Sequence, residues 1–211
     1  QDAVIFGLEN QSIALANQLH KHNWNVKIVN TEEKNTNKVD KIELIELKTI
    51  SLTALKKLKL EKTEAIILML SDEDNYKLAE LIYENIGIKD VIVRLNKRAN
   101  FEKFHKLGAL IIEPATAIVS LLDHFVRSPS ATSLLLGMDD GQDTIDIEVR
   151  NKDIHGMRLR ELRLPSDILV LSVKRKGQLI VSHGYTRLRL ADIITMVGSE
   201  TSLKELKFKF D

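Results

Sequence analysis

The chain of 211 residues contains no cysteine, which excludes a disulfide scaffold, thiol chemistry and cysteine-based zinc sites, and which suits the cytosol. Aromatic residues make up only 5%, and no apolar run approaches the roughly 20 residues that a bilayer-spanning helix needs. Neither sign of charge dominates, since 31 lysine and arginine residues stand against 30 aspartate and glutamate residues. The balance provides no basic face, so we expect no nucleic-acid partner.

The histidines and aspartates predict no metal site. His20 and His22 are two apart in a predicted helix and so face different directions, and the other four histidines are isolated. A group of aspartates near position 140 offers oxygen ligands of the kind that Ca²⁺ or Mg²⁺ takes. Their Asp-Asp-Gly sequence is first a turn signal, and the turn is the favoured interpretation. The group comprises Asp139, Asp140, Asp143 and Asp146.

Short apolar segments alternate with amphipathic helical patterns over the first 113 residues, which is typical of βαβ units around a parallel sheet. We therefore predict an α/β fold with a doubly wound, mostly parallel Rossmann-like sheet. The expected strands are 3–7, 25–30, 42–47, 65–70, 90–95 and 109–112. The expected helices are 10–22, 52–58, 73–86 and 97–107, and the polar segment 31–40 is expected to be a loop.

A further helix is predicted over residues 115–127, with apolar positions such as Ile118, Leu122 and Phe125 at helical spacing. Its apolar face could pack on its own sheet or against a second subunit, and the sequence does not decide between them. Ser128-Pro129-Ser130 and the Gly-Met-Asp-Asp-Gly segment 137–141 then interrupt the pattern. We interpret 128–141 as a hinge between two domains.

The remaining segment, 142–211, predicts a small α+β domain. Strands are expected at 144–149, 169–175, 178–182 and 193–197, with a short helical turn at 158–162 and a closing helix at 199–206. The Lys176-Gly177 turn between two of these strands predicts antiparallel pairing. The domains expected are thus 1–127 and 142–211.

The first strand, turn and helix stand where a dinucleotide-binding fold carries G-x-G-x-x-G. Here the turn reads Gly7-Leu8-Glu9-Asn10-Gln11-Ser12, so Glu9 takes the second glycine position and Ser12 the third. The second glycine lets a pyrophosphate approach the backbone, and a helix N-terminus favours anions. A carboxylate there adds both bulk and like charge, which argues against ordinary nucleotide binding.

Several motifs resemble the regulator of potassium conductance (RCK, or TrkA) family, which joins an N-terminal Rossmann-like domain to a TrkA C-terminal domain. The second half of the chain is similar to the family's C-terminal signature. The matching residues are Gly156-x-x-Leu159-x-Glu161-Leu162-x-Leu164-Pro165, followed by Val173-x-Arg175-x-Gly177 and by Gly184, Leu188, Asp192 and Val197-Gly198. His183 departs from the proline usual before that glycine. In the first half, the resemblance lies in Ser71-Asp72-Glu73-Asp74-Asn75, Val91-Ile92-Val93-Arg94 and Gly108-Ala109-x-x-Ile112-x-Pro114.

The resemblance implies a cytoplasmic, ligand-sensing regulatory module of a potassium channel, potassium uptake system or cation–proton antiporter at the inner face of the membrane. Such a module acts by conformational coupling rather than by catalysis. Its membrane partner is fused to it or separate, and the Gln1 start suggests a piece of a longer polypeptide. The family also implies a homodimer through residues 115–127, with Leu121, Leu122 and Phe125 as contacts.

The cofactor that the resemblance implies is NAD(H) or an adenine nucleotide, although Glu9 and Ser12 disfavour it. Asn30 ends the second strand where the family often has an acidic residue, and Leu47-Lys48-Thr49 replaces a Gly-Asp element after the third. If a nucleotide is bound, its contacts are expected at Gly7, Leu8, Asn10, Asn30, Glu32, Ser71, Asp72 and Arg94.

Several of these site residues also have a purely structural interpretation. Ser71 or Asp72 could simply cap a helix, and Arg94 could face a phosphate or pair with a carboxylate of the 71–74 cluster. A basic concentration in the C-terminal domain could bind an anion, but a solvated face is favoured; it comprises Arg158, Arg160, Arg163, Lys174, Arg175, Lys176, Arg187 and Arg189. The rival functions are an NAD(P)-dependent oxidoreductase, which lacks a proton-transfer constellation, and a gating scaffold that has lost nucleotide binding.

Overall fold

The computed structural model describes residues 1–31, 42–87, 90–137 and 141–210. The chain divides into two compact units, residues 1–119 and 120–211. The expected loop 31–40 lies almost entirely outside the described residues. The division between residues 119 and 120 falls inside the helix Pro114–Arg127. It does not test the predicted domain boundaries at 127 and 142, which stay predictions.

The N-terminal unit is built on a six-stranded parallel sheet with the strand order β3-β2-β1-β4-β5-β6. The order reverses between β1 and β4, as in a doubly wound dinucleotide-binding fold. The predicted fold class is therefore confirmed, and the strands match their expected positions to within two residues. They are β1 (Asp2–Phe6), β2 (Asn25–Asn30), β3 (Glu43–Glu46), β4 (Ala65–Leu68), β5 (Val91–Arg94) and β6 (Leu110–Ile112).

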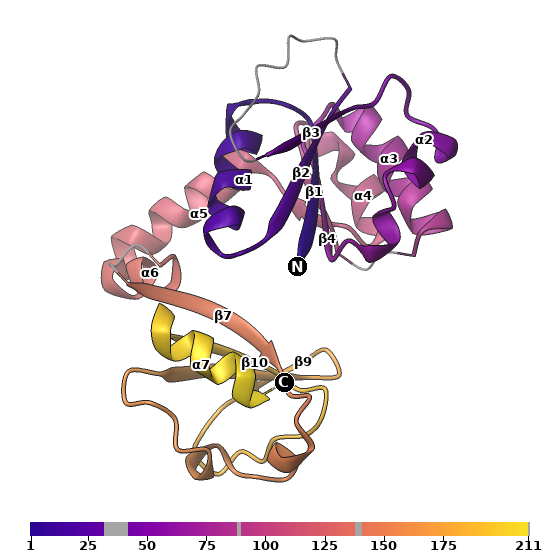
Figure 1. Cartoon of the computed structure of the whole chain (residues 1–211). Coiled ribbons are helices and arrows are strands. Elements are labelled where there is room, and N and C mark those ends of the chain that lie inside the picture. Colours follow the sequence, from indigo (N-terminus) through magenta and orange to yellow (C-terminus); the bar gives the residue numbers. More distant parts are fainter. Residues whose placement is uncertain (32–41, 88–89, 138–140, 211) are drawn as a thin grey trace. The chain divides into compact units, whose positions relative to one another are not determined.

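Helices cover both faces of this sheet (Figure 1). Along β1, Ala3 and Ile5 face α1 in one apolar cluster, while Val4 and Phe6 belong to a second cluster with α2, α3 and α4. This alternation explains why the strand is apolar throughout, since both of its faces are buried. The helices are α1 (Asn10–Lys21), α2 (Leu52–Lys57), α3 (Asp72–Asn85) and α4 (Phe101–Leu107), with the 3₁₀ turns η1 (Leu60–Lys62) and η2 (Arg98–Asn100).

Helix α5 (Pro114–Arg127) buries none of its side chains, although its apolar residues share one face. Val126 is 84% exposed, Val119 66%, Leu122 61% and Ile118 57%. The alternative in which this face packs on its own sheet is therefore wrong for the described chain.

A short helix, α6 (Pro129–Leu135), occupies half of the segment 128–141 that was predicted to be a hinge. We expected Ser128-Pro129 to interrupt regular structure, but proline stands at the beginning of this helix, where its missing N–H costs nothing. The prediction of an irregular segment is thus wrong for 129–135, and the hinge itself stays a prediction.

The C-terminal unit contains a four-stranded antiparallel sheet with the order β7-β10-β8-β9, confirming the predicted small α+β domain. Lys176 and Gly177 both have positive φ, 48° and 82°, which suits a tight hairpin turn between β8 and β9. The elements are β7 (Gln142–Glu148), β8 (Leu169–Arg175), β9 (Gln178–Val181), β10 (Ile193–Ser199), η3 (Lys152–Ile154), η4 (Leu159–Glu161) and α7 (Glu200–Phe210).

Helix α7 contributes Leu203, Leu206 and Phe210 to the core of this unit, together with Val173 and Met196 of the sheet. Phe210 is completely buried. Its carbonyl accepts hydrogen bonds of 2.9 Å from the backbone N–H groups of Arg150 and Asn151. The end of α7 is thereby joined to the segment that follows β7.

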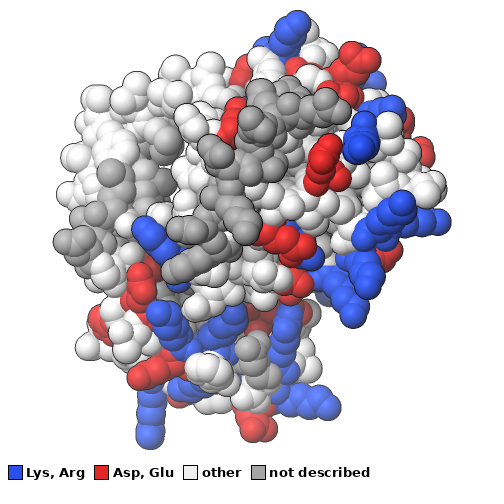
Figure 2. All heavy atoms as spheres, turned by 45° about the horizontal axis from the view of Figure 1, so that its top comes forward, with Lys and Arg blue, Asp and Glu red and all other residues white. Residues whose placement is uncertain are grey.

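Within the described segments, no helix is both long and apolar enough to cross a membrane. Side chains of both signs are interspersed on the face shown in Figure 2. The expectation that nucleic acid is not a partner stays a prediction.

Candidate functional site

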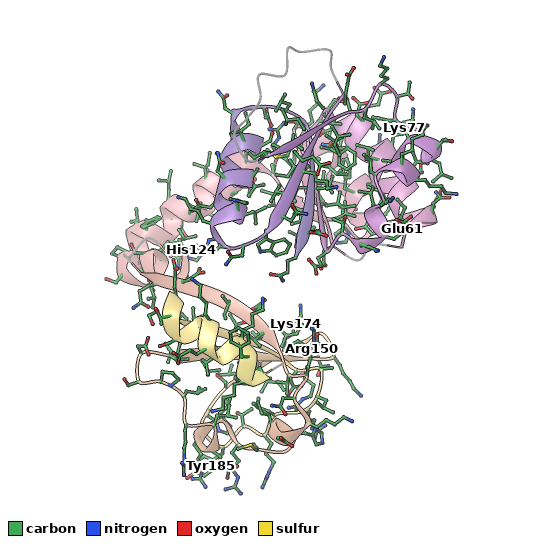
Figure 3. All side chains as sticks on the ribbon, in the orientation of Figure 1. Glu61, Lys77, His124, Arg150, Lys174 and Tyr185 are labelled. Atoms are coloured by element: carbon green, nitrogen blue, oxygen red, sulfur yellow. The ribbon has the colours of Figure 1, made fainter. Side chains whose placement is uncertain are left out.

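A cleft of about 1060 Å³ lies in the N-terminal unit at the carboxyl ends of β1, β4 and β5. Open α/β sheets place ligands at this edge, where the strand order reverses. Lys77, labelled in Figure 3, reaches it from α3. The cleft is lined by Gly7, Leu8, Glu9, Asn30, Thr31, Leu47, Lys48, Thr49, Ile50, Met69, Leu70, Ser71, Asp72, Glu73, Asp74, Lys77, Arg94, Asn96, Lys97 and Asn100.

The turn between β1 and α1 explains why Gly7 remains in the altered phosphate loop. Gly7 has φ +115°, and a Cβ built on it would lie 3.0 Å from the carbonyl oxygen of Met69. Only glycine is free of strain in that backbone conformation. Glu9, in contrast, has an extended backbone with φ −147° and precedes α1 as its N-cap residue, so a side chain is tolerated there.

Ser12 stands at the third glycine position and still allows α1 to pack closely on the sheet. It is completely buried, and its Oγ accepts a 3.1 Å hydrogen bond from the backbone N–H of Glu9. The third glycine normally permits close packing of the helix on the sheet. Serine is small enough to occupy the same place, and its hydroxyl stabilises the beginning of α1.

Arg94, at the end of β5, connects the ends of three strands. Its Nη1 donates to the carboxylate of Glu9, in the turn after β1, and its Nη2 donates at 2.8 Å to the carbonyl of Met69, just after β4. A further contact of 3.3 Å joins Nη1 to the side-chain oxygen of Gln11. The proposed pairing of Arg94 with the 71–74 cluster is therefore wrong, because the guanidinium faces the turn after β1.

The 71–74 cluster is held mainly by hydrogen bonds within the protein. Ser71 caps α3, since its Oγ accepts a 3.2 Å hydrogen bond from the backbone N–H of Asp74. Asp72 accepts from the backbone N–H groups of Asn96 and Lys97, at 2.8 and 2.9 Å, and from the Asn100 side chain at 2.7 Å. Burial raises the pKa of Asp72, but these hydrogen bonds outweigh it and leave the pKa below its usual value. Asp72 thus fastens the loop after β5.

Sequence reasoning missed Asn75 as an organiser of this edge. Its completely buried side chain accepts from the N–H of Leu70 at 3.0 Å and donates to the carbonyls of Leu70 and Arg94 at 3.1 and 3.3 Å. It therefore links α3 to the ends of β4 and β5. Asn96 and Asn100 were missed as well, and the only local signal for them was a pair of asparagines shortly after a strand.

Six of the eight predicted contact residues line the cleft: Gly7, Leu8, Asn30, Ser71, Asp72 and Arg94. Asn10 is not among the lining residues, because it is the exposed first residue of α1. Glu32 lies outside the described residues. The role of the set in binding a nucleotide stays a prediction.

The residues present do not fit the pyrophosphate of a dinucleotide. A carboxylate stands where the loop needs its second glycine, and Arg94 already pairs with that carboxylate. An incoming phosphate would meet the like charge of Glu9 next to the backbone N–H groups that should receive it.

The two described members of the predicted aspartate group, Asp143 and Asp146, accept hydrogen bonds within the protein. Asp139 and Asp140 lie outside the described residues. Asp146 accepts a 2.7 Å hydrogen bond from Thr195 across the sheet, and the backbone N–H of Thr144 donates to Asp143 at 2.8 Å. Among the described residues, no group of three or more potential ligands could hold a metal ion.

The basic side chains of the C-terminal unit are partly engaged within the unit. Arg175 forms a two-armed pair with Asp192, whose side chain is 1% exposed, and also donates to the Arg187 carbonyl. Arg187 donates to the carbonyl of Gly156 at 2.9 Å. The guanidinium of Arg160 lies 4.2 Å from the ring centre of Tyr185, which Figure 3 labels. These contacts lie within the unit, and the solvated face that the sequence favours stays a prediction.

Comparisons with known proteins agree with this architecture. Residues 3–119 match the TrkA-N domain and residues 145–210 the TrkA-C domain. YjbQ of Bacillus subtilis, a candidate Na(+)/H(+) antiporter, is 24% identical over 206 residues, which are 95% of this chain and 33% of YjbQ. A Trk system potassium uptake protein TrkA homolog of Archaeoglobus fulgidus is 20% identical over 150 residues, covering 71% of this chain and 34% of that protein.

The fold also resembles that of the human SLO3 gating ring, with a TM-score of 0.65 at 14% identity over 99% of this chain and 46% of that one. At this identity the likeness concerns the fold alone. The chain spans about a third of the length of the two relatives named above. Its two domain matches, in the order TrkA-N then TrkA-C, cover nearly all of it. The chain therefore belongs to the RCK/TrkA family.

Proposed function

We propose that this chain is a cytoplasmic regulatory module of a cation channel, potassium uptake system or cation–proton antiporter, acting by conformational coupling rather than catalysis. The observation that carries the proposal is the pairing of a TrkA-N and a TrkA-C unit in one chain. Its relatives include a candidate antiporter and a potassium uptake protein homolog, both much longer than this chain. A membrane-embedded partner, fused or separate, supplies the transport pathway.

The chemistry of the cleft supports a non-catalytic role. Hydride transfer between a nicotinamide cofactor and a substrate needs bound cofactor and a group that moves a proton. Among the described residues, the cleft is lined by no histidine or tyrosine. Of the acids that line the cleft, Glu9 pairs with Arg94 and Asp72 is held by four hydrogen bonds to the segment after β5. An oxidoreductase thus has no support in this arrangement.

We propose further that the module is a homodimer through α5. The support is the exposed apolar face of that helix, where Ile118, Leu122 and Val126 meet no other part of the described chain closely enough to be buried. Of the three expected contacts, Leu121 and Leu122 are exposed and Phe125 is half-buried. Burying a leucine side chain completely contributes about 1.5–3 kcal/mol, so several such residues could hold two copies together.

The dimer is tested by light scattering on the purified chain at micromolar concentration. Leu122→Glu places a charge in the apolar face and should shift the molecule to a monomer. Ser120→Glu is the matched control, because Ser120 lies on the opposite side of the same helix and is exposed too. A wild-type chain that is monomeric throughout would remove the dimer from the proposal.

The regulatory role itself is tested by cation flux into vesicles that contain the membrane partner. Flux is measured with and without this chain, or, for a fused protein, with and without the corresponding segment. We expect removal to change the dependence of flux on effector or ion concentration. Identical flux curves in both preparations would overturn the role.

A further inference from the structure

We propose that the carboxylate of Glu9 is an internal substitute for a ligand phosphate, so that it alone closes the phosphate-binding end of the cleft to pyrophosphate-bearing nucleotides. The inference deepens the proposed function, on which it rests for its regulatory meaning. It identifies the residue that determines which ligands the cleft excludes.

The carboxylate of Glu9 lies next to the beginning of helix α1. Glu9 is the N-cap residue of α1, a helix of 12 residues, and stands in the turn that delivers a pyrophosphate to a helix N-terminus in this fold. A helix N-terminus favours negative charge. The Glu9 side chain supplies that charge from within the chain.

The partner of the Glu9 carboxylate is Arg94. Arg94 is mostly buried, with 20% of its side chain exposed, and its Nε has no hydrogen-bond partner among the described residues. A guanidinium in such a place needs an anion to offset its desolvation, and a phosphate or a carboxylate serves equally well. Because Nη1 donates to Glu9, the requirement is met without ligand.

An incoming phosphate would meet both members of this ion pair. It would have to displace Glu9 from Arg94 and then remain next to the freed carboxylate, which repels it. The part of the cleft that lies away from this turn, near Asn30, Lys48 and Thr49, is not blocked by the ion pair. Glu9 therefore excludes the phosphates of a nucleotide from the cleft but not its nucleoside part.

Glu9→Gly is the variant that opens the site. Glycine restores the second glycine of the loop, is a good N-cap residue, and leaves Arg94 without its carboxylate. Glu9→Gln removes the charge but keeps the size, and so separates repulsion from bulk. Glu73→Gln is the matched control, because Glu73 also lines the cleft but is exposed and lies outside the turn.

The experiment is calorimetric titration of the whole 211-residue chain and its variants with NAD⁺, ADP, inorganic pyrophosphate and adenosine. Wild type and Glu73→Gln should bind NAD⁺, ADP and pyrophosphate at least about tenfold more weakly than Glu9→Gly, a difference of about 1.4 kcal/mol. Glu9→Gln should fall between them. Adenosine should show no dependence on Glu9. Circular dichroism establishes that each variant is folded.

Two results would overturn the proposal. One is wild-type affinity for NAD⁺ or ADP equal to that of Glu9→Gly, since the carboxylate would then exclude nothing. The other is a folded Glu9→Gly chain that binds none of the phosphates, since something other than Glu9 would then close the site.

A double-mutant cycle on thermal unfolding keeps the proposal testable if Glu9→Gly fails to fold. It combines Glu9→Gln with Arg94→Lys, and the two effects should be strongly non-additive. Additive effects would contradict an ion pair that acts as a unit. None of these measurements involves dimerisation or transport, so failure here is distinguishable from failure of the regulatory role.

Discussion

The carboxylate of Asp192 is the most deeply buried charge with a defined partner among the described residues. Its oxygens accept hydrogen bonds from two nitrogens of Arg175, both at 2.8 Å, and from the backbone N–H of Arg189 at 2.8 Å. The side chain is 1% exposed. Removing one member of such a pair leaves the other buried and uncompensated, which costs far more than the pair itself contributes.

We predict that Asp192→Asn lowers the free energy of unfolding of the C-terminal unit by about 3 kcal/mol, the low end for a broken buried pair, because Arg175 is partly exposed. The change is measured by urea denaturation. Glu148→Gln serves as the control, since Glu148 pairs with Arg150 on the surface, and it should change stability by less than about 1 kcal/mol. Equal effects of the two substitutions would show that Asp192 is not energetically buried.

The same residue predicts a pH dependence. Burial raises the pKa of Asp192, but its hydrogen bonds from Arg175 and Arg189 lower it by more, so the folded-state pKa lies below the ordinary 3.8. The unfolded chain therefore binds a proton first as pH falls. The stabilising contribution is complete above the unfolded pKa of about 3.9 and is lost as the pH falls towards the folded value.

Urea denaturation at pH 6 and at pH 3 should accordingly show that wild type loses more stability than Asp192→Asn over that interval. The variant carries every other acidic group, including Asp72, so the difference between the two chains isolates Asp192. Parallel losses in both chains would contradict the lowered pKa.

At the scale of an element, β10 depends on the absence of a side chain at one position. A Cβ built on Gly198 would lie 2.5 Å from Ile168 Cδ1 and 2.7 Å from the carbonyl oxygen of Asp167. The side chain could move, but the backbone oxygen could not without shifting the segment before β8. At Gly198, β10 therefore lies so close to Asp167 and Ile168 that only glycine fits without strain.

Gly198→Ala is predicted to destabilise the C-terminal unit by about 2–3 kcal/mol through overpacking. Thermal unfolding measures the effect. The control is Gly184→Ala, because a Cβ there would lie 3.5 Å from the Cβ of Arg160, an ordinary contact. A tolerated alanine at 198 would mean that the close approach is relieved at little cost.

The completely buried Asn75 joins helix α3 to the ends of β4 and β5. Asn75→Ala should leave the N–H of Leu70 and the carbonyl of Arg94 without this partner, at a cost of about 1–3 kcal/mol per buried group left unpaired. The carbonyl of Leu70 keeps the Asn96 side chain as a donor. Asn85→Ala is the control, since the exposed Asn85 only donates to Leu81 within the same helix. Urea denaturation of the two variants compares them, and an equally mild effect of both would contradict the role given to Asn75.

The elements themselves were largely predictable, because strand periodicity and helix capping are local. Strands β2 and β8 begin and end at the predicted residues. Helix α6 was not predicted, because Ser-Pro was interpreted as an interruption although proline also begins helices.

For the candidate site, the sequence predicted where the cleft lies but not which side chains pair within it. Arg94 and its partner Glu9 are 85 residues apart, and sequence alone did not indicate which carboxylate the guanidinium would face.

At the scale of the whole molecule, the C-terminal unit has a core of its own, formed by residues such as Ile147, Val173, Ile194 and Leu203. We predict that residues 142–211 fold in isolation, which also tests the predicted domain boundary. Far-UV circular dichroism should show a cooperative thermal transition for this fragment. The control fragment carries Ile194→Asp, which buries an unpaired charge at a completely buried position and should abolish the transition. A wild-type fragment without a transition would place the boundary elsewhere.

The way in which Phe210 is held has a practical consequence for anyone who alters the chain near that residue. Its ring fills the core of the unit, and its carbonyl receives the N–H groups of Arg150 and Asn151. Trimming the last turn of α7 would thus remove a core side chain together with the one carbonyl that accepts both of these hydrogen bonds. Affinity tags or fluorescent fusions attached at this end need a spacer that begins after Phe210, and a protease that nicks α7 would yield a product that unfolds rather than a shortened native domain.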